Sequence, residues 1–242
     1  MIDKTQEDRI TDYLVSQHLS LDILVEIRDH MIHQIAALEW DENLSFEDAF
    51  SKVKESWKGE FEMVNYWLFF PTKIPLIAKR IIRGKYNQML KYSLMIGGLS
   101  LGINILLAYL SSTEDMFTTL FRIFNSLFLV ALGGVWILNF KIRKYMSADF
   151  KYRGKCFYTL YQKNIGLIVA CTIGMPQLIT NSGHYIYEFF KHQDTANIFT
   201  VCNIVFFSFV LETFAAFSLF NFYGHKKNLM KMQEFLTPTA DE

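Results

Sequence analysis

The stretch YSLMIGGLSLGINILLAYL, residues 92–110, decides the fold class of this chain. It holds 19 residues and no charged side chain. A helix of that length, at a rise of about 1.5 Å per residue, nearly covers the roughly 30 Å hydrocarbon core of a bilayer. The run is continuously apolar rather than alternating, and backbone groups in lipid must be satisfied within the segment. It therefore predicts a transmembrane helix and not a barrel strand.

Three more apolar runs follow, at residues 117–140, 160–179 and 198–222. The whole chain agrees with this pattern, because 51% of its residues are hydrophobic and 23 are phenylalanine, which is heavy for a soluble fold. We therefore expect an all-α integral membrane protein. Residues 92–225 form a four-helix transmembrane bundle in this interpretation, and residues 226–242 form a tail.

Basic residues that flank the four runs predict their orientation. Sixteen stand on one side of the expected membrane: Lys73, Lys79, Arg80, Arg83, Lys85, Lys91, Lys141, Arg143, Lys144, Lys151, Arg153, Lys155, Lys163, Lys226, Lys227 and Lys231. The other side has Arg122 and Lys191. Lys and Arg concentrate on the cytoplasmic side, so both termini should be cytoplasmic, and the loops 111–116 and 180–197 should face outward.

Residues 1–65 predict an acidic cytoplasmic domain of three amphipathic helices. Residues 1–62 carry 15 acidic and 6 basic side chains, whereas the rest of the chain carries 9 and 18. Ser20 is a favourable N-cap for the second helix, and Ser45 with Asp48 resembles a capping box at the start of the third. A core from about 60 residues is marginal, so this domain should lean on the membrane or on a partner.

Residues 66–91 predict a basic interfacial segment between that domain and the first span. Pro71 and Pro75 interrupt the segment, which excludes a spanning helix there. Aliphatic and aromatic side chains beside Lys and Arg suit the headgroup boundary. We expect a linker helix after Pro75.

Glu212 is the most informative polar residue of the predicted spans. It lies ten residues from the cytoplasmic end of its run, roughly 15 Å deep, and Asn104 lies about 18 Å deep in the first run. An ionised carboxylate there is costly, so Glu212 should be protonated, paired or facing water. The two side chains could meet, either to fix helix packing or to gate a substrate or proton.

Pro176 should kink the third run, because proline removes a backbone hydrogen bond. A kink can line a small cavity, although membrane helices tolerate proline routinely. Glycines at positions 97, 98, 102, 133 and 134 indicate close helix packing.

Two sets of side chains could ligate a metal. Glu26, His30 and His33 share one face of the second helix, and the outer loop holds His184, Glu188, His192 and Asp194. Zinc takes imidazole and carboxylate ligands, but polar residues also gather on solvated helix faces and in short loops. We predict no metal site, and we treat Glu26, His30 and His33 as weak candidates.

No recognised catalytic or phosphate-binding pattern occurs in the sequence. The sequence therefore predicts a non-enzymatic protein without a cofactor. The basic loop 141–155 suits anionic lipid headgroups rather than nucleic acid. The expected partners are the bilayer and a cytoplasmic protein that the acidic domain docks, and homo-oligomerisation stays open.

Three segments of the acidic domain resemble the HAAS-type helical domain and the related permease-prefix segments: residues 10–14 (ITDYL), 24–31 (LVEIRDHM) and 45–50 (SFEDAF). The likeness covers about residues 5–62, and the family's closing glycine-aspartate-proline signal is replaced here by residues 57–61 (WKGEF). The resemblance implies a bacterial inner-membrane protein with a cytoplasmic regulatory or docking role. A small transporter or permease-associated subunit that uses Glu212 is the alternative.

Overall fold

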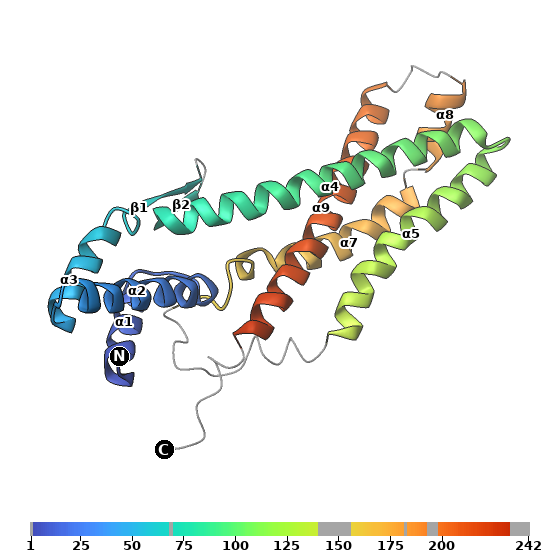
Figure 1. Ribbon diagram of the computed structural model, residues 1–242. Coiled ribbons are helices and arrows are strands. Elements are labelled where there is room, and N and C mark those ends of the chain that lie inside the picture. Colours follow the sequence, from blue (N-terminus) through green and yellow to red (C-terminus); the bar gives the residue numbers. More distant parts are fainter. Residues whose placement is uncertain (1, 68–69, 140–155, 182, 193–197, 233–242) are drawn as a thin grey trace. The chain divides into compact units, whose positions relative to one another are not determined.

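The computed structural model describes residues 2–67, 70–139, 156–181, 183–192 and 198–232. These residues are mostly helical, so the expected all-α character is confirmed, with one short hairpin added (Figure 1). The chain divides into two compact units. The first comprises the described parts of Met1–Tyr86, Asp149–Gln162 and His225–Glu242, and the second those of Asn87–Ala148 and Lys163–Gly224.

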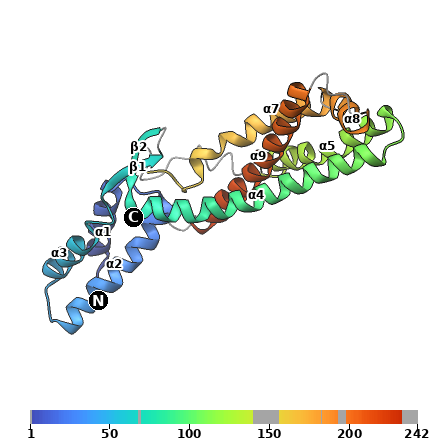
Figure 2. The ribbon, with the colours of Figure 1, turned by 90° about the horizontal axis from the view of Figure 1, so that it is seen from above.

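Three helices form the N-terminal part of the first unit: α1 (Lys4–Ser16), α2 (Leu21–Asp41) and α3 (Phe46–Trp57). They pack together as Figure 2 shows, and α2 contacts both α1 and α3. Buried side chains recur at helical spacing on all three: Ile10, Leu14, Leu24, Ile27, Met31, Ile35, Phe46, Phe50 and Val53. The three helices expected from the amphipathic pattern are present.

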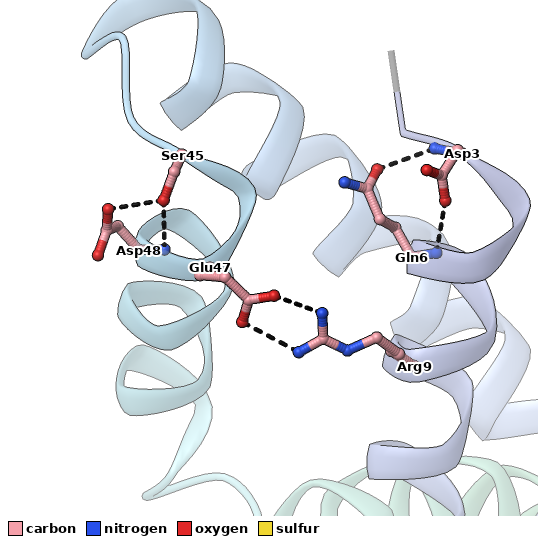
Figure 3. A network of polar contacts seen from close by, with 6 residues as sticks. All are labelled: Asp3, Gln6, Arg9, Ser45, Glu47 and Asp48. Atoms are coloured by element: carbon pink, nitrogen blue, oxygen red, sulfur yellow. Dashed lines mark hydrogen bonds and ion pairs between the residues drawn. The ribbon is translucent and has the colours of Figure 1, made fainter.

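Polar contacts cap the starts of α1 and α3 (Figure 3). Asp3 accepts from the Gln6 amide at 2.8 Å, and the Gln6 side chain accepts from the Asp3 amide at 2.9 Å, which is a capping box. Ser45 caps α3 as expected, accepting from the Asp48 amide at 3.2 Å. Ser20 stands at the N-cap of α2, but its side chain makes no capping bond there.

A bidentate ion pair between Arg9 and Glu47 joins α1 to α3 (Figure 3). The hydrogen bonds from Arg9 hold the pKa of the Glu47 carboxyl below its usual value. A carboxyl with a lowered folded-state pKa stabilises the fold above its unfolded pKa, and this contribution is lost as the pH falls through the folded value.

The Glu47→Gln variant is therefore expected to lose less stability of α1–α3 than the wild type does when the pH falls below about 4.5, near the ordinary glutamate pKa. The wild-type ion pair is present at neutral pH and absent in acid, whereas the variant lacks it throughout. Thermal unfolding of the intact protein at several pH values, followed by circular dichroism, measures this difference. Glu26→Gln, an exposed position on α2, is the control; an equally reduced loss of stability there would contradict the prediction.

A β-hairpin that the sequence did not predict follows α3. Strands β1 (Met63–Trp67) and β2 (Phe70–Pro75) pair antiparallel, with Met63 opposite Pro75. The prolines that exclude a spanning helix are tolerated here, because both strands of a two-stranded sheet are edges. A helix follows the hairpin directly after Pro75, as expected from the sequence.

That helix, α4 (Leu76–Leu110), is longer than predicted. It runs without interruption across residue 91, where the sequence placed the boundary between linker helix and first span. The part of α4 before residue 91 carries Lys and Arg, and the part after it is apolar. Charged side chains are compatible with a helix outside lipid, so the helical backbone continues although the polarity of its side chains changes.

The second unit adds α5 (Glu114–Leu138), α7 (Gly166–Asn181), α8 (Gly183–His192) and most of α9 (Ile198–Lys231). In Figure 1, α5 lies beside α7 and α8, and it contacts both. The basic loop predicted at residues 141–155 lies outside the described residues.

Three helices of the described chain are long and apolar enough to cross a membrane: α4, α5 and α9. The third predicted run, residues 160–179, is α-helical only from Gly166, so α7 has 16 residues and spans about 24 Å. A short 3-10 helix, η1 (Gln162–Asn164), precedes it. The Gln162 side chain accepts from the Tyr158 amide at 2.7 Å, which favours a turn where the sequence predicted helix. Four full-length spans are therefore not established.

The apolar helices expose hydrophobic side chains and bury polar ones. Leu99 of α4, Val130 of α5, Ile173 of α7 and Phe206 of α9 are each about two-thirds or more exposed. Such large apolar faces are rare on soluble monomers and are compatible with a membrane location.

Candidate functional site: a buried polar cluster of three apolar helices

Asn104 of α4 and Glu212 of α9 meet where the two helices cross. Asn104 Nδ2 donates to Glu212 Oε1 at 3.2 Å, and both side chains are buried. The sequence raised this contact as an option because the two residues lie at similar depths in their runs. It is now a direct interhelical hydrogen bond.

Asn125 of α5 completes the cluster, and the sequence analysis missed it. Its Nδ2 donates to Asn104 Oδ1 at 3.2 Å and to the Phe121 carbonyl oxygen at 2.9 Å. The signal was an amide within the apolar run 117–140. Asn104 thus bridges two other helices, since it donates to α9 and accepts from α5.

The hydrogen bonds of the cluster are incomplete. Among the described residues, Glu212 Oε2 and Asn125 Oδ1 are buried and make no hydrogen bond. None of the ion pairs in the described part of the chain includes Glu212. A charged carboxylate in an apolar interior needs a partner charge or several hydrogen-bond donors. The cluster therefore suits a protonated, neutral carboxyl, or a carboxylate that binds a cation.

Close approach of α4 to α9 makes the cluster geometrically feasible. A Cβ atom at Gly97 would overlap the Thr213 side chain and lie 3.3 Å from the Phe209 carbonyl oxygen. Gly98 and Gly102, by contrast, have no heavy atom within 4 Å of such a position. Of the glycines proposed from the sequence as packing sites, Gly97 is the one that faces a neighbouring helix in the described structure.

Pro176 lies inside α7 with its side chain exposed. The Thr180 hydroxyl donates to the Pro176 carbonyl oxygen at 2.9 Å. None of the hydrogen bonds described for the chain joins Pro176 to Glu212.

The weak metal candidates Glu26, His30 and His33 are exposed along α2. Among described residues, the group of three whose ligand atoms lie within 4.8 Å of one another is a different one: Glu114, His184 and Glu188. His184 and Glu188 belong to the outer loop set of the sequence analysis, and Glu114 is new. The His192 side chain and Asp194 lie outside what the structure describes.

A second polar site lies in the first unit, at Asp22 in the first turn of α2. Its carboxylate accepts from the Leu160 amide at 3.2 Å and from Asn228 Nδ2 at 2.7 Å. The Leu21 amide donates to the Phe157 carbonyl oxygen at 2.8 Å beside it. Nothing in the local sequence indicates these contacts, because their partners lie over 130 residues away.

Neither family models nor curated proteins nor solved structures yield a match to this chain. The resemblance of residues 5–62 to the HAAS-type domain therefore stays a prediction from short sequence patterns. Fold and site rest on the chain's own residues.

Proposed function

We propose that this chain is a multi-pass protein of a bacterial inner membrane with a regulatory or docking role and no catalytic one. In this proposal α4, α5, α7 and α9 span the bilayer and both termini are cytoplasmic. The exposed apolar faces of the four helices support the membrane location, and the sixteen flanking cations support the orientation.

The observation that carries a regulatory role is the set of contacts at Asp22. One carboxylate ties the start of α2 to the segment that leads into α7, through Leu160, and to the last turns of α9, through Asn228. Hydrogen bonds to a charged acceptor are among the stronger polar contacts, worth about 1.5–3 kcal/mol each. The acidic helices are thereby held to two segments that continue into apolar helices.

A partner that binds the acidic helices and competes with these contacts would change how residues 157–162 and the last turns of α9 are restrained. The N-terminal region carries a net charge of −9 over residues 1–62, so the partner should present a basic surface. Trp40, which is 88% exposed among acidic neighbours at the end of α2, supplies an apolar contact for it.

The test is Asp22→Ala in the intact membrane protein, compared with Asp12→Ala, an exposed aspartate of α1. Loss of the Asp22 contacts is expected to speed amide exchange at residues 157–162 by about tenfold or more, matching at least 1.4 kcal/mol. Crosslinking in native membranes through a photoreactive residue at Trp40 then reports partner binding.

We expect a reproducible basic partner with the wild type and with Asp12→Ala, and a changed yield with Asp22→Ala. The docking role is wrong if the wild type crosslinks to nothing. The coupling through Asp22 is wrong if exchange at residues 157–162 is unchanged.

The buried Glu212 favours one rival function, a small proton-linked transporter. A carboxyl among apolar helices with an unbonded oxygen is the kind of group that takes up and releases a proton. Glu212→Gln keeps the size of the side chain and an acceptor for Asn104, but it cannot ionise. Transport would fall to background in this variant, whereas docking at the acidic helices would be unchanged; proteoliposome uptake and the crosslinking assay distinguish the two.

A further inference from the structure

Two carboxylates and one imidazole come together where the start of α5 meets α8: those of Glu114, His184 and Glu188. One ligand atom from each lies within 4.8 Å of the other two, and His184 Nδ1 is 2.6 Å from Glu114 Oε1. Glu114 is the first residue of α5, whereas His184 and Glu188 stand one turn apart on α8. The helical spacing of four places the last two on one face.

Packing between α5 and α8 holds the three side chains at this spacing. The rings of Phe117 and Tyr187 stack with centroids 5.7 Å apart. At Gly183, a Cβ atom would lie 3.2 Å from the Thr118 hydroxyl oxygen, so the backbone of α8 closely approaches α5. Contacts outside the cluster thus hold the backbones of α5 and α8 close together at the position of the three side chains.

The charges of the cluster favour a cation. Two carboxylates this close repel each other, and a single imidazolium balances only one of them. Lys191, the lysine of α8, donates instead to the Tyr109 carbonyl oxygen at 3.1 Å. A divalent cation would neutralise both carboxylates and would at the same time be coordinated by an imidazole nitrogen.

We propose that Glu114, His184 and Glu188 form a binding site for a divalent transition-metal ion of the zinc type. Imidazole suits zinc and its neighbours in the first row, whereas calcium and magnesium prefer all-oxygen sites. Three protein ligands leave one position of a tetrahedral zinc ion for water or another ligand. With the proposed topology, the site faces the outside and joins α5 to α8, so it would make this end of the bundle responsive to external metal.

The experiment measures Zn²⁺ binding by calorimetry to the full chain in detergent, after treatment with a chelator. Cys156→Ser, Cys171→Ala and Cys202→Ser form the background, which removes thiolate ligands. We expect one zinc per chain. His184→Ala and Glu188→Gln should each weaken binding at least tenfold, because even partners outside the ligand shell are worth about 10- to 100-fold. Excess Ca²⁺ should not displace zinc.

The matched controls are His33→Ala and Glu26→Gln, the same residue types on the exposed face of α2. They should bind zinc as the background does. Co²⁺ loading adds a spectroscopic readout, with visible bands of a nitrogen and oxygen site. Circular dichroism confirms folding of each variant, and Glu188→Gln keeps the side-chain shape should His184→Ala misfold. Absence of stoichiometric zinc binding in the background protein, equal affinity in Glu188→Gln, or loss of binding in the α2 controls would overturn the assignment.

Discussion

Asn104→Leu is expected to destabilise the second unit by about 2–3 kcal/mol, because it removes the central amide of the polar cluster. Glu212 then loses the donor at Oε1 while Oε2 is already unbonded, and Asn125 keeps only the Phe121 carbonyl oxygen. A buried carboxyl that has lost its hydrogen bond from Asn104 is the main source of the loss. Reversible unfolding of the protein in mixed micelles, followed by circular dichroism, gives the difference in free energy.

A double-mutant cycle separates the orphaned carboxyl from simple loss of packing. Glu212→Leu alone leaves Asn104 bonded to Asn125, and the double variant Asn104→Leu/Glu212→Leu removes both partners. Replacing both members of a buried pair by apolar groups is often nearly neutral. The double variant should therefore be more stable than the sum of the two single effects predicts. If the two single losses of stability simply add, the hydrogen bond between Asn104 and Glu212 contributes no coupling free energy.

Gly97→Leu is expected to disrupt the packing of α4 on α9 at a cost of about 3 kcal/mol or more, at the upper end of overpacking effects. A Cβ atom already overlaps Thr213, and the Phe209 carbonyl oxygen at 3.3 Å belongs to the backbone and cannot rotate away. The helices must separate, which also lengthens the Asn104–Glu212 hydrogen bond. Thermal unfolding in detergent and crosslinking between cysteines placed on α4 and α9 report the two effects.

Gly98→Leu is the matched control, because the neighbouring glycine has no heavy atom within 4 Å of its Cβ position. It adds the same side chain and the same change in helix propensity. A loss of stability in Gly98→Leu equal to that in Gly97→Leu would mean that propensity or insertion, and not contact with Thr213, sets the effect.

Periodicity and helix caps predicted the parts of the fold that depend on local sequence. The apolar stripe of α2 and the Ser45 cap of α3 each follow from residues less than two turns apart, and both are present. The β-hairpin was missed because its pairing, Met63 with Pro75, depends on strands whose prolines indicated only the absence of helix. The start of α7 was placed six residues early, since hydropathy does not detect the turn that Gln162 stabilises.

The candidate site was predicted in part for a related reason. Depth along an apolar helix is a simple count of residues, so Asn104 and Glu212 could be paired from the sequence. Rotation about the helix axis depends on packing partners, so the third member, Asn125, could not be assigned to the same interior. Asp22 and Glu114 were missed because their partners are distant in sequence and come together only in the folded chain.

The exposed apolar side chains of α4, α5 and α9 affect which substitutions this molecule tolerates. Under the proposed membrane location, the surroundings of α4, α5 and α9 are as apolar as the bundle interior, so solvent exclusion does little to hold the helices together. Association then depends on directional and close contacts at Asn104, Asn125, Glu212 and Gly97. With that location, the exposed aliphatic side chains should tolerate replacement by other apolar residues, and diverged versions of this chain should share the three polar positions and Gly97 rather than overall sequence identity.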